Sequence, residues 1–207
     1  MQKKYSYLEI EVKFFISDID RIKRHMMDSG AVEHHHKFES NICFENPDEN
    51  LKSNGKLLRL RRDGSCQLTY KSRPSQTDHD YKVLREIEVE IGDFQTMFDI
   101  LKALGFKVMQ CYEKWRGTYT WKDVVFCLDT MPFGTFLEIE GSKSSIIEAA
   151  RKLNLVWEER ILANYLFIFE KLKDKFNLPF NDITFKNFEK YPVDITPVLQ
   201  LLQVGKK

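Results

Sequence analysis

The chain has 207 residues, of which 43% are hydrophobic and 30% are charged, and its formal net charge is +1. This length suits one well-packed core with a small addition, and the composition is that of an ordinary globular protein. A net charge near zero gives no overall field that would attract a nucleic-acid polymer or an acidic membrane surface. Any affinity for anions must therefore come from local clusters of bases.

The sequence shows no sign of export or membrane insertion. Its first ten residues, "MQKKYSYLEI", lack the apolar core of a signal peptide, and no apolar run approaches the length of a membrane span. The four cysteines are widely spaced and form no C-x-x-C pair. We therefore expect reduced thiols in a cytoplasmic protein, and neither a disulfide framework nor a zinc site.

Hydrophobic periodicity and turn residues predict the elements of the first half of the chain. In chain order these are a strand at 5–15, a helix at 18–29, a strand at 35–45, a hairpin around Asp63 and Gly64, a polar loop at 73–80 and a strand at 82–91. Asp18 can cap the helix and Gly30 can end it. The Asp-Gly pair is a strong hairpin signal, and we expect the polar loop, which contains Pro74, to be mobile.

Helices and a further hairpin fill the second half. In chain order these are a helix at 93–104, a hairpin over 111–130 that turns at Lys122 and Asp123, a strand at 135–141, helices at 142–153 and 158–175, and a short helix near 196–203. Asp93 and Ser142 are suitable N-caps, and Gly105 is a suitable helix stop. Three prolines interrupt the tail at 176–207.

Charged residues occupy one parity of the predicted strands. In the first strand Glu9, Glu11 and Lys13 alternate with apolar residues, as side chains on opposite faces of a strand do. The other strands repeat the pattern with Arg59, Arg61, Lys71, Lys82, Glu86, Glu88, Glu90, Lys114, Arg116, Asp129, Glu138 and Glu140. A single strand of this kind most often presents its charges to water. The repetition across many strands favours a shared charged face instead.

The amphipathic helices indicate which way that face points. If the charges met water, the apolar faces would fill the interior of a barrel and the helices would have nothing to cover. If the apolar faces point outward, the helices pack on them and the charges line the interior. The sequence therefore predicts an α+β fold in which eight antiparallel strands form a closed β-barrel, or tunnel, with a charged lumen and helices packed on the outside.

Acids and bases gathered in one lumen predict an ionic ligand. Burying many charges is costly unless they are paired or bind ions. A polyanion with a divalent cation would satisfy both kinds of charge, because bases bind phosphate oxygens and carboxylates bind metal. Arg62, Arg73 and Arg85 lie off the charged parity and are expected on the surface.

The order of the motifs adds a resemblance to a known family. Glu9, Glu11 and Lys13 form an E-x-E-x-K motif, which is followed by "LLRLR", "LTYKS", "REIEVE", "YEKWR" and "LDTMPFGTFLEIEG". This ordered set, over about residues 5–170, resembles the CYTH superfamily of triphosphate tunnel metalloenzymes. The superfamily includes class IV adenylyl cyclases, thiamine triphosphatases and inorganic tripolyphosphatases. The resemblance implies an eight-stranded tunnel domain in residues 1–175, with 176–207 as a C-terminal extension packed on or near it.

The resemblance also implies roles for the charged residues. The triphosphate would be bound by Lys13, Arg59, Arg61, Lys71, Lys114 and Arg116. Mg²⁺ or Mn²⁺ would be held by Glu9, Glu11, Asp129, Glu138 and Glu140. Glu88, together with Glu86 or Glu90, would complete the acidic wall by orienting the bases or by holding a second metal ion.

These roles predict a metal-dependent phosphohydrolase that acts on inorganic tripolyphosphate or an organic triphosphate. A class IV adenylyl cyclase, which converts ATP to cyclic AMP and pyrophosphate, is the alternative, because both reactions need nearly the same charged cage. A non-catalytic polyphosphate or nucleotide binder is less favoured, because the acidic set is complete. The expected ligand is a small triphosphate-containing molecule, with no nucleic-acid polymer or membrane as partner, and a homodimer is left open.

Several other residues are given ordinary structural roles. The run His34-His35-His36 is expected at a solvated strand start, because consecutive strand residues alternate faces and at most two of the three could share a metal site. Trp115 is expected to pack beneath a helix, whereas Trp121, near a hairpin tip, is a candidate for stacking on a base or thiamine ring. The remaining aromatic residues considered are expected in a helix core: Tyr165, Phe167 and Phe169.

Overall fold

The computed structural model describes residues 8–76 and 78–206. Within these ranges the strands are β1 (Leu8–Ile16), β2 (Val32–Glu45), β3 (Leu57–Arg62), β4 (Cys66–Ser72), β5 (Lys82–Ile91), β6 (Lys107–Trp121), β7 (Val124–Met131) and β8 (Gly134–Glu140). The α-helices are α1 (Ile19–Asp28), α2 (Phe94–Ala103), α3 (Lys143–Lys152), α4 (Tyr165–Phe176), α5 (Phe185–Lys190) and α6 (Thr196–Leu202). Short 3₁₀ turns lie at Trp157–Glu159 and Val204–Lys206. Residues 5–7 of the first predicted strand lie outside the described residues.

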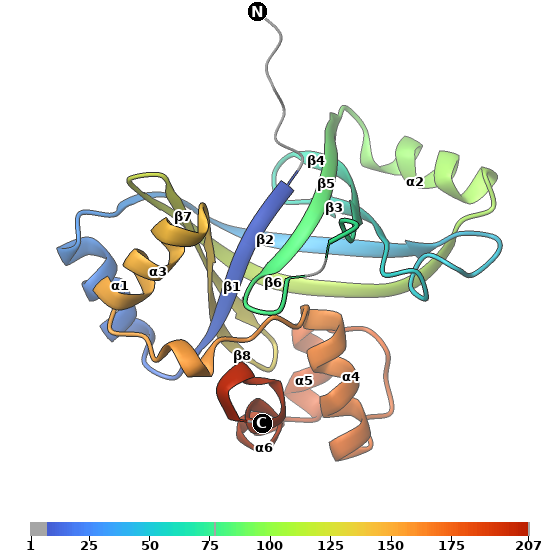
Figure 1. The fold of residues 1–207 in the computed structure, drawn as a ribbon. Coiled ribbons are helices and arrows are strands. Elements are labelled where there is room, and N and C mark those ends of the chain that lie inside the picture. Colours follow the sequence, from blue (N-terminus) through green and yellow to red (C-terminus); the bar gives the residue numbers. More distant parts are fainter. Residues whose placement is uncertain (1–7, 77, 207) are drawn as a thin grey trace, which may run out of the picture.

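The strands close into one ring. Their order is β1-β5-β4-β3-β2-β6-β7-β8, every pairing is antiparallel, and β1 pairs with both β5 and β8. This arrangement confirms the predicted eight-stranded closed sheet. Figure 1 shows the helices outside the ring, with α1 and α3 on one side, α2 on the opposite side and α4 to α6 at one end.

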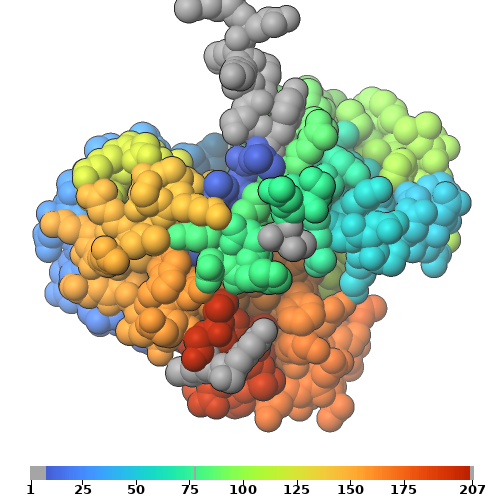
Figure 2. Space-filling view, in the orientation of Figure 1, coloured from blue at the N-terminus to red at the C-terminus, as the bar shows by residue number. Residues whose placement is uncertain are grey.

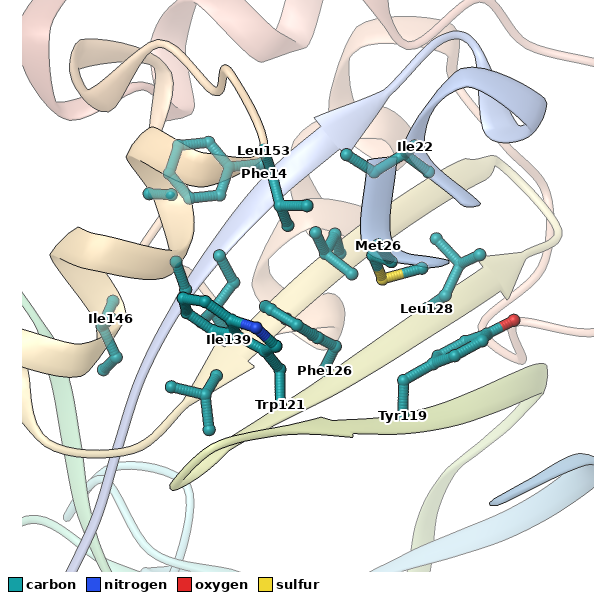
Figure 3. Close-up of a cluster of buried hydrophobic side chains, with 14 of the residues drawn as sticks. Phe14, Ile22, Met26, Tyr119, Trp121, Phe126, Leu128, Ile139, Ile146 and Leu153 are labelled. Carbon is teal, nitrogen blue, oxygen red and sulfur yellow. The ribbon is translucent and has the colours of Figure 1, made fainter. Parts of the chain in front are cut away.

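The apolar faces of the strands point outward beneath the helices, as predicted. Ile139 of β8 is fully buried in a cluster that includes Ile146 of α3 and Met26 of α1, and Figure 3 shows these side chains between sheet and helices. On the other side, Leu60 of β3 is fully buried against Leu101 of α2. The alternate residues of the same strands must then face the lumen, because successive side chains of a strand point to opposite faces.

The helix boundaries follow local capping chemistry. The Asp18 carboxylate accepts a hydrogen bond from the backbone N–H of Arg21 at 2.9 Å, and Gly30 has φ of +88° just after the end of α1. Asp93 and Ser142 cap α2 and α3 in the same way. These predicted caps are confirmed.

The C-terminal helices form a separate apolar cluster at one end of the ring. Phe169 of α4, Phe188 of α5 and Val198 of α6 pack with Phe136 of β8. The predicted helix at 196–203 corresponds to α6, whereas the sequence patterns missed α5. The tail therefore packs on the barrel, and the division into a domain at 1–175 and an extension stays a prediction.

The predicted helix at 158–175 is wrong in its first part, because α4 begins only at Tyr165. The backbone of Ile161 instead exchanges hydrogen bonds with that of Lys13, at 2.7 and 3.2 Å. Among the described residues, β1 pairs with β5 only as far as Glu11, and Ile161 pairs with the edge of β1 that is left free. The Asn164 side chain then caps α4.

Both tryptophan predictions are wrong. Trp115 is 41% exposed and stacks on His36 on the outer face of β2 and β6, so it is not buried beneath a helix. Trp121 is buried in the apolar cluster of Figure 3, and its indole N–H donates to the backbone oxygen of Ser29, so it cannot stack on a ligand. The run His34-His35-His36 is exposed at the start of β2, as predicted. Among the helices that the structure describes, none is long and apolar enough to cross a membrane.

Candidate active site

The lumen contains a cavity of about 920 Å³. The predicted site residues that line it are Glu9, Glu11, Lys13, Arg59, Arg61, Lys71, Glu88, Lys114, Arg116, Glu138 and Glu140. Asp129 lies behind this surface and is fully buried. A cavity of this size is large enough for a small organic ligand. The sheet therefore brings these lining residues into one chamber, although they come from six strands of the described chain.

Three segments outside the strands also line the cavity. The loop between β2 and β3 contributes Lys52, the loop between β4 and β5 contributes Arg73, and α4 contributes Leu166. In Figure 2 the loop after β4, coloured green, lies on the same face as the cyan 46–56 segment and the orange α4. Arg73 is exposed, as predicted, but lies at the cavity rim. The mobility expected for 73–80 stays a prediction.

Three of the five predicted metal ligands meet at one place. One carboxylate oxygen from each of Glu9, Glu11 and Glu140 lies within 4.8 Å of one from each of the others. The sheet produces this cluster because Glu11 of β1 pairs directly with Glu140 of β8 and Glu9 lies two residues away on the same face. Carboxylate oxygens are the ligands that Mg²⁺ prefers.

The electrostatics of this carboxylate cluster suit a cation. Burial, together with the nearby charges of Glu11 and Glu9, raises the pKa of Glu140 to about 8. Like charges this close resist simultaneous ionisation. A divalent cation would relieve the repulsion, so the residues present fit a metal ion.

The other two predicted metal ligands lie among bases. Asp129 accepts hydrogen bonds from Lys114 at 2.9 Å and from two guanidinium nitrogens of Arg116, each at 2.6 Å. Glu138 contacts Lys13 at 2.7 Å and Arg116 at 2.5 Å. Burial would raise the pKa of Glu138, but Lys13 and Arg116 outweigh it and hold that pKa well below its ordinary value. The two acids therefore orient three of the predicted phosphate-binding groups.

A second group of bases lies across the lumen. The Lys71 ammonium is 2.7 Å from Glu9 and 2.8 Å from Glu86. Burial alone would lower the pKa of Lys71, but these two carboxylates raise it, so the side chain stays cationic. The guanidinium of Arg59 is fixed by the Tyr112 hydroxyl at 3.0 Å. Acids thus hold the bases in place on both sides of the lumen.

Comparison with known proteins agrees with this geometry. A sequence model of the CYTH domain matches residues 7–163 of the chain. The chain belongs to the CYTH family. A relative from Methanocaldococcus jannaschii, provisionally named an adenylate cyclase, is 33% identical over 153 residues, which are 73% of this chain and 86% of the relative.

Solved structures share the CYTH tunnel. A protein of Pyrococcus horikoshii OT3 is 31% identical, with a TM-score of 0.66 over 76% of this chain and 96% of that chain. A protein of Hippeastrum is 19% identical, with a TM-score of 0.57 over 79% of this chain and 95% of that chain. It is described as a provisional adenylyl cyclase with a dominant triphosphatase activity. The CYTH match to this chain ends at residue 163, so α4, α5 and α6 lie beyond it.

Among the residues of the CYTH cavity wall that sequence reasoning missed are Glu39, Tyr112 and Tyr165. Glu39 lies on the inward parity of β2, opposite Lys114 of β6, so the strand pattern contained a signal for it. Tyr165 was expected in a helix core. No strand parity could have placed it, because the facing of a helix end depends on how that helix docks.

Three of the predicted phosphate-binding bases surround the carboxylate of Glu39. Its carboxylate is 3.4 Å from Lys114, 3.8 Å from Arg116 and 3.9 Å from Arg61. Burial would raise the pKa of Glu39, but these bases outweigh it and lower the pKa from 4.5 to about 2. A depressed acid pKa contributes stability that is present above pH 4.5 and is lost as the pH falls toward 2.

We therefore expect Glu39→Gln to lower the free energy of unfolding at pH 7 by roughly 3 kcal/mol. The difference from the unchanged protein should shrink between pH 4.5 and pH 2, because the carboxyl group becomes protonated there. Urea unfolding at a series of pH values measures both effects. Glu148→Gln, at an acid that is 57% exposed, is the control and should change stability by about 0.5 kcal/mol or less. If Glu39→Gln and Glu148→Gln lost equal free energies of unfolding, the stabilising role of the Glu39 carboxylate would be contradicted.

Proposed function

We propose that this CYTH protein is a divalent-metal-dependent phosphohydrolase whose substrate is a triphosphate bound inside the tunnel. The observation that carries the proposal is the division of one cavity into two kinds of wall. One part holds the carboxylate cluster of Glu9, Glu11 and Glu140, in which Glu9 contacts Lys71 at 2.7 Å and Glu11 contacts Lys82 at 2.6 Å. The rest holds buried bases fixed by their own acids. A metal ion and a polyphosphate chain together would satisfy both parts.

The metal ion proposed here is Mg²⁺ or Mn²⁺, held by Glu9, Glu11 and Glu140. Asp129 and Glu138, which the resemblance also assigned to the metal, lie outside this carboxylate cluster and each contact two bases, so we propose that they position those bases. When bound, the ion would supply positive charge that polarises a phosphoryl oxygen and favours ionisation of water.

The protein's own side chains would bind the triphosphate and stabilise the transition state. Lys13, Lys114 and Arg116 on one side and Arg59, Arg61 and Lys71 on the other would bind the phosphate oxygens and stabilise the charge that builds on them during transfer. The Glu88 carboxylate accepts a hydrogen bond from the Thr69 hydroxyl at 2.8 Å, and that hydroxyl accepts one from the Arg59 guanidinium at 3.2 Å. We therefore propose that Glu88 orients Arg59 through Thr69. A water oxygen would attack the terminal phosphorus, and the bond to the bridging oxygen would break, releasing orthophosphate.

Adenylyl cyclase activity is the second candidate, because the relative from M. jannaschii carries a provisional cyclase name. In that reaction the ribose 3′-hydroxyl would attack the α-phosphorus and pyrophosphate would leave. Hydrolysis is favoured here because Trp121, the stacking candidate for a base, is buried in the core. The description of the Hippeastrum protein also puts triphosphatase activity first for that protein.

One assay separates the candidates. The protein is incubated with tripolyphosphate, ATP or thiamine triphosphate in the presence of Mg²⁺ or Mn²⁺, and orthophosphate, pyrophosphate and cyclic AMP are measured. We expect orthophosphate from at least one substrate, and none after a chelator is added. Cyclic AMP with equimolar pyrophosphate from ATP would establish the cyclase instead. Tight binding of a triphosphate without any product would indicate a binder.

The cellular setting is proposed from the sequence. All four cysteines in the described chain are free, which accords with the reducing cytoplasm that we propose.

A further inference from the structure

The first residue of α4 enters the tunnel from beyond the matched part of the chain. Tyr165 lies two positions after residue 163, where the CYTH match ends, and it lines the cavity with the predicted phosphate-binding residues. Only 8% of its surface is exposed. In Figure 1, α4 lies at one end of the strand ring. A segment outside the matched region therefore contributes to the wall of the chamber.

The Tyr165 hydroxyl contacts the acid that orients two bases. It donates a hydrogen bond to Asp129 at 2.9 Å, to the same oxygen that receives Lys114 and one guanidinium nitrogen of Arg116. Burial and the charges of Asp129 and Glu138 keep the pKa of Tyr165 well above its ordinary value, so the hydroxyl remains a donor. Without this donor, Asp129 would have only the two bases to neutralise it.

The Tyr165 ring contacts two ammonium groups. The Lys13 nitrogen lies 4.4 Å from the ring centroid and the Lys114 nitrogen lies 5.6 Å from it, both within the range of cation–π attraction. The ring thus takes the place of water on one side of each ammonium group. The free N–H donors of these groups are left for carboxylates and for the cavity.

We infer that Tyr165 is a positioning residue for triphosphate binding, acting through Asp129, Lys13 and Lys114, and that the C-terminal segment is part of the catalytic unit. This inference rests on the proposed function, since it assigns those bases to phosphate. The hydroxyl holds Asp129, and with it Arg116, in one orientation. The ring holds the two lysines at fixed positions where they can meet phosphate oxygens.

The test uses three variants of the full chain. Tyr165→Phe removes the hydroxyl and keeps the ring, and Tyr165→Leu removes both. Phe169→Leu is the matched control, because Phe169 lies one turn further along α4, is fully buried against Phe180 and Phe188, and is not part of the cavity wall. For each we measure kcat, KM, the melting temperature, and the Kd for tripolyphosphate without metal by calorimetry.

We expect kcat/KM to fall about 10-fold for Tyr165→Phe and about 30-fold or more for Tyr165→Leu, as expected for loss of a hydrogen bond to a charged group and then of the cation–π contacts. The metal-free Kd should weaken mainly in Tyr165→Leu, because that variant loses the ring beside both lysines. Phe169→Leu should lower the melting temperature but keep kcat/KM and Kd within twofold of the unchanged protein.

Two results would overturn the inference, and they are distinguishable. If the unchanged protein turns over a triphosphate and both Tyr165 variants keep kcat/KM and Kd within twofold of it, Tyr165 only packs. If the unchanged protein neither binds nor turns over any triphosphate, the proposed function fails and this inference fails with it.

Discussion

Glu140→Gln should abolish metal-dependent turnover without weakening the fold. Among the described residues, no base forms a hydrogen bond or ion pair with Glu140, and the Cys127 thiol lies 3.9 Å from its carboxylate. Its carboxylate instead meets those of Glu9 and Glu11. A neutral amide of the same shape removes one ligand and relieves the repulsion. We expect turnover with Mg²⁺ or Mn²⁺ to fall at least about 100-fold, on the scale seen for losing one stabilising group of an active site.

The stability of Glu140→Gln should move the opposite way from its activity. An acid whose pKa is raised in the folded state destabilises that state at any pH above its unfolded value, so its removal should leave the metal-free melting temperature equal or higher at pH 8. The increase in melting temperature that saturating Mn²⁺ gives the unchanged protein should disappear. Glu148→Gln, at an acid that is 57% exposed and outside the cavity lining, is the control. Unchanged turnover, or an undiminished response to Mn²⁺, would remove Glu140 from the metal site.

Arg116→Met should have the largest effect on stability. Two guanidinium nitrogens of Arg116 donate hydrogen bonds to Asp129, which is fully buried, and one of them also donates to Glu138 at 2.5 Å. Removing the cation leaves an uncompensated buried charge, which costs about 3–5 kcal/mol. That cost is comparable with a large part of the stability of a typical domain. Urea unfolding at pH 7 measures the loss, and phosphate release measures the accompanying loss of turnover.

Two further variants make the Arg116 prediction specific. Lys122→Met breaks an ion pair of the same 2.6 Å length, but its partners are 55% and 57% exposed, so we expect a change of about 1 kcal/mol or less. Arg116→Lys keeps the charge and loses the planar fork, so it should recover part of the stability but little of the turnover. Similar losses for Arg116→Met and Lys122→Met would mean that burial does not govern these pairs.

Much of the fold could be predicted because strands and helices have different periods. Glu9, Glu11 and Lys13 alternate with apolar residues, so a strand that puts Ile139 or Leu60 under a helix must turn its charges into the lumen. The direction of every charged face followed from the need of the amphipathic helices for an apolar surface. The helix caps at Asp18, Asp93 and Ser142 followed from local chemistry alone.

The division of labour among the acids could not be predicted, because it depends on the register between strands. Glu11 faces Glu140 and Lys13 faces Glu138 across β1 and β8. A shift of two residues would keep every charge in the lumen and yet exchange these partners. Parity alone therefore predicts which residues line the tunnel, but not which acid meets a base and which acid meets other acids.

Tyr165 and the start of α4 show a second limit. The periodicity of 158–175 indicates a helix, but the free edge of β1 at Lys13 draws Ile161 into an extended bridge. That pairing sets where α4 begins and turns its first residue toward the lumen. Such long-range competition leaves no signal within the segment itself.

The most direct test of the charged tunnel is a crystal structure of the protein grown with Mn²⁺ and tripolyphosphate, measured so that the anomalous signal locates manganese. We predict a manganese peak among Glu9, Glu11 and Glu140, with the phosphates extending toward Lys13, Lys71 and Arg116. Manganese and phosphates bound only on the outer surface, with the lumen holding neither, would contradict the account.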